Sequence, residues 1–303
     1  MAFDPTHFDP NRRYRTEAPC AGLIEDVAAL AALGPERSHQ EGTYKFIGCT
    51  CLLLAAATPA GILALLHNPE PAPLWPNMAC PILASLGLFV LFTRPTRRAF
   101  ELEARRSQLV TQLLRLLGTD IAARERVVLD FDMRPESHSD KLVGTNTTGS
   151  GWKARHYLDP WLRLEGRLLD GNGFRVDVTE RVELRGRQSR SSSGRLKRKT
   201  KRLSDALIRV RLRVPPEQHP HLSRLGEKAS GAVKLPEGTR LKSLRVEGDH
   251  LDLTVRVEQP WRARDAREPS TVYAPLVVAM CFLSLYQLLH LSQVLTRRAL
   301  PTR

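Results

Sequence analysis

Cysteine is absent from the long middle of this 303-residue chain. The five cysteines are Cys20, Cys49, Cys51, Cys80 and Cys281. A disulfide framework or a cysteine zinc site needs several cysteines at short spacing, so neither can form between Arg94 and Thr271. This usage is typical of a reducing compartment. Lysine is also scarce, with nine against 37 arginines, and this bias suggests the GC-rich genome of a bacterium.

Charge is absent from two apolar runs in the first third of the chain, residues 46–66 and 77–93. A helix of about 20 apolar residues is long enough to cross roughly 30 Å of hydrocarbon. The runs therefore predict a transmembrane helical hairpin over residues 46–93. The first run begins behind 45 residues, which is too deep for a cleaved signal peptide.

A third run without charge covers residues 272–295. Its length and composition predict a C-terminal transmembrane helix. Gln287 and His290 lie three residues apart in its second half and would share one helix face, so a helix at the membrane interface is an alternative. A helix buried in a protein core can also be apolar on all sides.

The orientation follows from lysines and arginines beside the first two runs. The loop between the runs has none, whereas the outer flanks hold Arg12, Arg13, Arg15, Arg37 and Lys45 before the hairpin and Arg94, Arg97, Arg98, Arg105 and Arg106 after it. Because positive flanks stay in the cytosol, we expect residues 1–45 and the region after residue 93 to be cytosolic. The chain would be a multi-pass protein of the inner (plasma) membrane. Arginines lie on both sides of the third run, so its orientation stays open.

The residues that follow the hairpin predict a cytosolic helix over residues 97–118. Its apolar side chains recur at helical spacing, at Leu102, Leu109, Leu113 and Leu116. Gly118 can end the helix. The leucine stripe needs a partner, which is either a short amphipathic helix within residues 1–45 or a second copy of the chain. The apolar side of that short helix would hold Leu23, Val27, Leu30 and Ala31.

From residue 126 the apolar period changes to two, which is typical of strands with one buried face. The alternating positions are Val127, Leu129, Phe131 and Met133; Leu162, Leu164 and Leu168; Phe174, Val176, Val178, Val182 and Leu184; Ile208, Val210, Leu212 and Val214; and Leu244, Val246, Leu251, Leu253, Val255 and Val257. Clear alternation predicts an antiparallel sheet, with a hairpin turn at residues 170–173. The expected fold class is an α+β membrane protein, in which the transmembrane hairpin and the C-terminal helix flank an antiparallel β-rich cytosolic domain at residues 119–270.

A segment without any acidic residue joins two of these strands. Residues 185–202 read RGRQSRSSSGRLKRKTKR and hold nine cations, Arg185, Arg187, Arg190, Arg195, Lys197, Arg198, Lys199, Lys201 and Arg202. The domain at residues 119–270 carries a net charge of +10, and these nine account for all but +1. We expect a long β-hairpin whose end projects as a basic arm, residues 185–205, and interpret the nine cations as an anion-binding site.

The expected partner of the arm is the lipid bilayer beside it. Each Lys or Arg near anionic lipid head groups is attracted by about 1 kcal/mol, and an acidic protein surface is the other candidate. Nucleic acid is less favoured, because the arm has no aromatic side chain to stack on bases. The sequence therefore indicates a membrane-anchored interaction or scaffold protein. A membrane-tethered nucleic-acid-binding protein and an accessory subunit of a larger membrane complex are the alternatives.

Catalytic and metal-binding motifs are incomplete. The glycines of residues 144–151 have phosphate-loop spacing, but Ser150 and Gly151 stand where Lys and Ser or Thr are needed. The HPH sequence at residues 219–221 has no third ligand at metal spacing. No nucleophile lies beside either polar pair that could act in acid–base chemistry, His138 with Asp140 and His156 with Asp159. We therefore expect no cofactor and no metal. The sequence gives no positive reason for an enzyme, although catalytic groups can converge from distant strands.

Overall fold

The computed structural model describes residues 13–32, 97–149, 151–190, 196–226, 229–258, 261–263 and 271–299. The chain divides into two units, of which one comprises residues 1–28 and 105–303 and the other residues 29–104. The predicted hairpin at residues 46–93 belongs to the second unit and lies outside the described residues. The first unit, called the β-domain below, contains the sheet and the arm.

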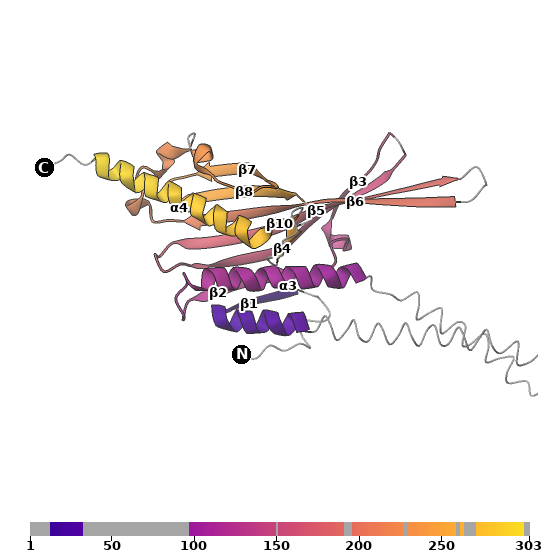
Figure 1. The fold of residues 1–303 in the computed structure, drawn as a ribbon, viewed down its shortest axis with the longest axis horizontal. Coiled ribbons are helices and arrows are strands. Elements are labelled where there is room, and N and C mark those ends of the chain that lie inside the picture. The colour runs from indigo at the N-terminus through magenta and orange to yellow at the C-terminus, as the bar shows by residue number, and fades with distance from the viewer. Residues whose placement is uncertain are drawn as a thin grey trace, which may run out of the picture. The chain divides into compact units, whose positions relative to one another are not determined.

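An eight-stranded antiparallel sheet forms the centre of the β-domain (Figure 1). Its strands are β1 (Arg13–Pro19), β2 (Arg126–Asp132), β3 (Leu142–Thr147), β4 (Lys153–Arg167), β5 (Gly173–Arg190), β6 (Leu196–Arg213), β7 (Thr239–Val246) and β8 (His250–Glu258). The order is β1-β2-β4-β5-β6-β8-β7, and β3 pairs with β4 beside this path. The predicted antiparallel β-rich architecture is confirmed.

Short elements connect the strands. They are the parallel pair β9 (Trp261–Arg262) and β10 (Val272–Tyr273) and the 3₁₀ turns η1 (Ser139–Lys141), η2 (Pro216–Gln218), η3 (Leu222–Leu225) and η4 (Ala229–Ala232). The turn between β4 and β5 lies at the predicted position, and Gly171 there adopts a φ of +85°. Only glycine takes up this left-handed conformation easily.

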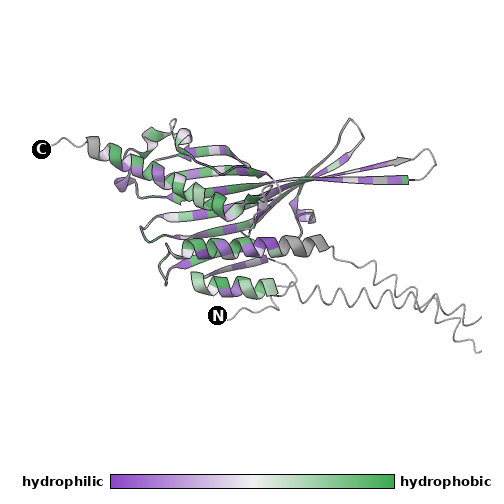
Figure 2. Ribbon diagram, in the orientation of Figure 1, coloured by the Kyte–Doolittle hydropathy of each residue, from purple (hydrophilic) through white to green (hydrophobic). Residues whose placement is uncertain are grey.

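The alternating apolar residues line one face of the sheet, and Figure 2 shows the alternation along the strands. Their buried members include Val127, Leu129, Phe131, Leu162, Leu164, Val176, Val178, Ile208, Val210, Leu212, Leu253 and Val255. The helices of the β-domain cover this face (Figure 1). We call it the helix-covered face, and the opposite one the open face.

The open face carries ion pairs between neighbouring strands. Each of three aspartates lies between two arginines, Asp177 between Arg163 and Arg175, Asp205 between Arg181 and Arg256, and Asp252 between Arg209 and Arg211. Partly exposed pairs of this kind contribute roughly 0–1 kcal/mol each. The open face is therefore exposed to solvent, and its three aspartates are each paired with arginines.

The helix α3 (Arg97–Gly118) has the bounds that the leucine spacing predicts. Leu109 and Leu113 are fully buried, whereas Leu116 is 41% exposed. The buried stripe therefore runs through Leu109, Leu113 and Leu117, and Arg106 occupies its next position toward the N-terminus. A charged residue in the middle of a buried stripe needs charged partners, which the sheet provides.

The N-terminal segment contributes an edge strand and a helix over residues 20–32. The edge strand β1 has no apolar alternation, and the sequence did not predict it. The thiol of Cys20 donates to the Leu114 carbonyl at 3.1 Å, so this helix lies beside α3, as one of the two alternatives proposed. Tyr14 of β1 donates to Asp26 Oδ2 at 2.6 Å and holds the helix against its own strand.

The helix α4 (Ala274–Ala299) forms where a transmembrane helix was predicted at residues 272–295. Ala274–Thr296 is long and apolar enough to cross a membrane. However, 56% of the 18-residue apolar window within this helix is buried inside the protein. The helix contacts β6 and β8, and its fully buried side chains include Val277, Cys281 and Leu285. Gln287 and His290 are exposed. The structure thus shows a helix that covers the sheet, and it does not show a membrane crossing.

Candidate functional site

A network of buried charges joins α3 to the helix-covered face. At its centre, Arg106 Nη2 lies 2.5 Å from Asp159 Oδ2 and 2.7 Å from Glu180 Oε2. Arg106 is 1% exposed, and both carboxylates are completely buried. Breaking such a pair would leave an uncompensated charge away from water. The bridge therefore fixes the position of α3 on β4 and β5.

Lys141 of η1 extends the network toward β2. Its Nζ lies 2.7 Å from Asp159 Oδ1 and 3.3 Å from Asp132 Oδ2, and its side chain is 4% exposed. Arg134 Nη2 lies 2.8 Å from the same Asp132 oxygen. The network thus connects elements from three separate parts of the sequence through alternating charges.

Two tryptophan rings pack against one side of the network. Trp261 of β9 stacks on Trp161 with 6.0 Å between ring centroids and 6° between ring planes. The Trp261 indole N–H donates to Glu180 Oε1 at 2.9 Å. Arg105 places its guanidinium 3.9 Å from the Trp261 ring centroid and its Nη2 2.8 Å from Glu180 Oε1. The guanidinium of Arg106 lies 4.9 Å from the Trp161 ring centroid. Since a cation is attracted to an indole face, Arg105 and Arg106 are each held by Glu180 and by an indole ring.

Two acids of the network, Glu180 and Asp132, have lowered pKa values. Burial by itself would raise the pKa of Glu180, but the charges of Arg106 and Arg105 outweigh burial and hold this pKa below its ordinary value. The pKa of Asp132 is likewise lowered against the effect of burial, by hydrogen bonds from Arg134 and the charge of Lys141. A general acid needs a pKa near the working pH. These carboxylates are suited to holding cations and not to proton transfer.

The arm is the end of the β5–β6 hairpin, where the two strands pair as far as Arg190 and Leu196. The pairing of β4 with β5 ends at Gly186, and that of β8 with β6 at Asp205. The hairpin therefore extends past the rest of the sheet (Figure 1). Of the nine predicted anion-binding residues, Arg195 lies outside the described residues. Only the backbone is described for Arg190 and Arg198.

The register places most of the cations of the arm on one face. Arg185 is opposite Lys201, and Arg187 is opposite Lys199. Directly opposite residues of an antiparallel pair share a face, and Lys197 belongs to the same alternation. These five cations continue the open face of the sheet. The opposite side of the arm continues the helix-covered face.

Carboxylate partners neutralise two cations at the base of the arm. Arg185 Nε lies 2.6 Å from Glu183 Oε1, and Arg202 Nη2 lies 2.5 Å from Glu136 Oε2. No described carboxylate pairs with four further cations, Arg187, Lys197, Lys199 and Lys201. These four charges, all on the open face, are available to an external anion.

Both connections to residues 29–104 leave the β-domain at the end where the arm projects. Arg106, near the start of α3 within this unit, contacts Glu180 close to the arm, whereas the residues after α3 bond to the β4–β5 turn at the opposite end. The N-terminal helix runs the other way. Cys20 lies beside the end of α3, and Asp26 bonds Tyr14 at the arm end of β1. The chain thus leaves after residue 28 and returns before residue 105 on the same side as the arm.

The acid–base pairs of the sequence have structural roles. His156 lies on the open face, where its Nε2 is 3.3 Å from Asn146 Oδ1, while Asp159 belongs to the buried network on the other face. His138 caps η1, since its Nδ1 accepts from the Asp140 backbone N–H at 3.4 Å. The hydroxyl of Ser139, between His138 and Asp140, donates to Asp140 Oδ1 at 3.2 Å.

The candidate phosphate loop and metal ligands also form no site. Most of residues 144–151 belong to β3 and to the turn before β4. His219 is 4% exposed, and burial lowers its pKa. No group of three metal-binding side chains occurs in the parts of the chain that the structure describes.

Arg105 and Arg106 were predicted to flank a membrane helix, and the structure places both in the buried network. The sequence contains a signal for the buried positions of these charges. Arg106 falls on the leucine stripe of α3, and Glu180 takes an apolar position in the alternation of β5.

Comparisons of the chain with protein families, with curated proteins and with solved structures gave no match.

Proposed function

We propose that this protein is a membrane-anchored interaction module whose basic arm docks on anionic lipid of the cytosolic leaflet. The observation that carries the proposal is the shared position of the arm and of both connections to residues 29–104. That segment contains the apolar runs at residues 46–66 and 77–93. If these runs cross the bilayer, the end of the β-domain with the arm faces the membrane.

The length of the arm supports docking. From Arg181 to Arg190, β5 extends about 30 Å at roughly 3.3 Å per residue. An arm of this length can lie along a leaflet that comes close to this end of the β-domain. Its open face can then rest on the head groups.

The buried network fixes the part of α3 that lies within the β-domain. Arg105 and Arg106 anchor α3 to Glu180, close to where the arm begins. Because this contact is buried and charged, it resists small displacements of the helix. This part of α3 and the arm are therefore held in a fixed relation within the β-domain, which lowers the entropy that docking has to overcome.

The test uses the full chain in lipid nanodiscs, with native cysteines replaced and a fluorophore on Ser192→Cys. Energy transfer to a head-group acceptor should increase when anionic lipid replaces neutral lipid, and it should fall as salt rises. At about 1 kcal/mol per charge, removal of three charges should abolish the increase, in the variant Lys197→Gln, Lys199→Gln and Lys201→Gln. The matched control removes three charges from β7 and should change nothing, in Arg240→Gln, Lys242→Gln and Arg245→Gln.

Two results would contradict docking on lipid. The first is energy transfer that is the same in neutral and anionic nanodiscs. The second is a response to duplex DNA at the same salt without any dependence on lipid charge, which would favour the nucleic-acid alternative.

A further inference from the structure

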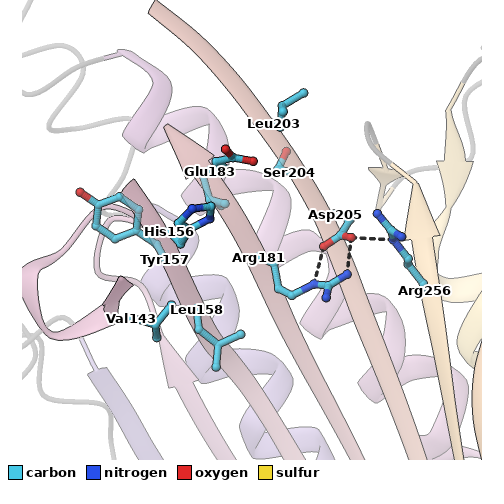
Figure 3. Close-up of a pocket in the computed structure, with 11 residues that line it drawn as sticks. Val143, His156, Tyr157, Leu158, Arg181, Glu183, Leu203, Ser204, Asp205 and Arg256 are labelled. Atoms are coloured by element: carbon cyan, nitrogen blue, oxygen red, sulfur yellow. Dashed lines mark hydrogen bonds and ion pairs between the residues drawn. The ribbon is translucent and has the colours of Figure 1, made fainter. Parts of the chain in front are cut away.

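An open hollow of about 640 Å³ lies at the root of the arm on the open face (Figure 3). Its apolar lining comes from Val143, Leu158 of β4 and Leu203 of β6. Arg181 and Arg256 line its polar side. The volume lies within the range of cavities that bind small amphipathic ligands.

The three aliphatic side chains are exposed on a face that is otherwise polar. Val143 is 64% exposed, Leu158 40% and Leu203 39%. Toward the far end of the sheet, the open-face positions of β4, β5, β6 and β8 hold paired arginines and aspartates. Exposed apolar side chains gathered in one place are typical of a binding surface.

The carboxylates in the hollow are already neutralised. Asp205 lies between Arg181, with 2.5 Å from Nη2 to Oδ2, and Arg256, with 2.6 Å from Nε to Oδ2 (Figure 3). Glu183 is paired with Arg185 at 2.6 Å. The two arginines and two carboxylates of the lining balance each other, so the positive charge that attracts an incoming anion comes from the neighbouring cations of the arm.

The hollow continues directly into the cationic face of the arm. Leu203 precedes Asp205 and follows Lys201 in the same alternation of β6, so its side chain shares their face. Leu158 pairs with Arg181, which lies four residues before Arg185 on β5. An apolar hollow and a row of cations thus lie side by side on one surface.

We infer that the hollow receives an acyl chain of an anionic phospholipid while the cations of the open face hold its phosphate. The inference rests on the proposed function, because the leaflet comes within reach only when the arm end faces the membrane. Free fatty acids share the chemistry of an amphipathic anion. The phospholipid is favoured because tethering beside a leaflet gives it a high effective concentration.

The experiment labels the full chain in nanodiscs with an anionic phospholipid that carries a photoreactive group in its acyl chain. Mass spectrometry should find adducts on peptides that contain Val143, Leu158 or Leu203. The variant Leu203→Ser should reduce these adducts about tenfold, since a buried leucine contributes roughly 1.5–3 kcal/mol. Leu241→Ser is the matched control, because Leu241 is 37% exposed and lies on β7. It should leave the adducts unchanged.

Three outcomes would overturn the inference. They are equal labelling by a zwitterionic analogue, labelling by a photoreactive fatty acid but not by the phospholipid, and labelling that Leu203→Ser and Leu241→Ser reduce alike. The energy-transfer signal of the arm separates this failure from failure of the proposed function. If the unmodified chain gives a normal lipid-dependent signal while the hollow remains unlabelled, the arm docks and the hollow does not take lipid.

Discussion

Arg106 Nη2 lies 2.7 Å from Glu180 Oε2, and neither side chain is more than 1% exposed. One residue belongs to the helix that returns from residues 29–104, and the other to the strand that continues into the arm. The contact therefore holds α3 and β5 together within the β-domain. Its strength determines how firmly the helix is held on the sheet.

Replacement of Arg106 by methionine should destabilise the protein by about 3–5 kcal/mol, because Glu180 and Asp159 would remain buried and charged near a neutral side chain. The measurement is thermal or urea unfolding of the full chain in detergent. Arg126→Met is the control, since Arg126 is 66% exposed and lies 3.6 Å from the exposed Glu17. That change should alter stability by less than about 1 kcal/mol. Equal losses in the two variants would show that the buried network does not hold α3.

We expect the protein to lose stability at acidic pH because of Glu180. Its pKa in the folded state lies below the ordinary value of 4.5, so its contribution is fully present above that pH and is lost as pH falls through the folded pKa. We expect the unfolding temperature to decrease below about pH 4.5. Glu180→Gln should be less stable at pH 7 and should show a smaller decrease in acid.

The control for this pH dependence is Glu258→Gln, which removes an exposed carboxylate 3.2 Å from Arg240. The shape of its profile should match that of the unmodified protein. If Glu180→Gln also keeps the full acid dependence, the other buried carboxylates account for it, and Glu180 does not.

The sheet could be predicted from the sequence because successive side chains of each long strand point alternately toward the core and toward water. Val127, Leu129 and Phe131 show this in β2, where exposed or half-buried residues alternate with fully buried ones. The edge strand β1 escaped prediction because its side chains are exposed or half-buried throughout. Its register with β2 depends on partners such as Asp130, which bonds Arg13, more than 100 residues away in sequence.

The buried network could not be predicted for a related reason. Arg106 meets Asp159 and Glu180 across 53 and 74 residues, and no local pattern connects them. The uncharged run at residues 272–295 was ambiguous in another way. A helix that covers a sheet and a helix that crosses a membrane both need many apolar residues.

Two glycines with similar backbone angles should respond differently to alanine. Gly171 has a φ of +85° and open space where a Cβ would lie, whereas a Cβ on Gly238, at φ +74°, would come within 2.6 Å of Val272 Cγ2. The left-handed conformation alone costs about 1–2 kcal/mol in an alanine. We expect Gly171→Ala to lose about this much and Gly238→Ala to lose more, as measured by thermal unfolding. Equal losses would mean that Val272 moves aside freely.

The sidedness of the arm tests the membrane arrangement most directly. With the five native cysteines replaced, a membrane-impermeant maleimide should label Ser192→Cys only after cell lysis, because under the proposed topology the positive flanks of residues 46–93 would keep the β-domain in the cytosol. Asn68→Cys, in the loop between the apolar runs, is the control and should be labelled in intact cells. Labelling of Ser192→Cys in intact cells would place the arm outside. It would then exclude the cytosolic leaflet and nucleic acid as partners and direct the cations toward polyanions of the cell envelope.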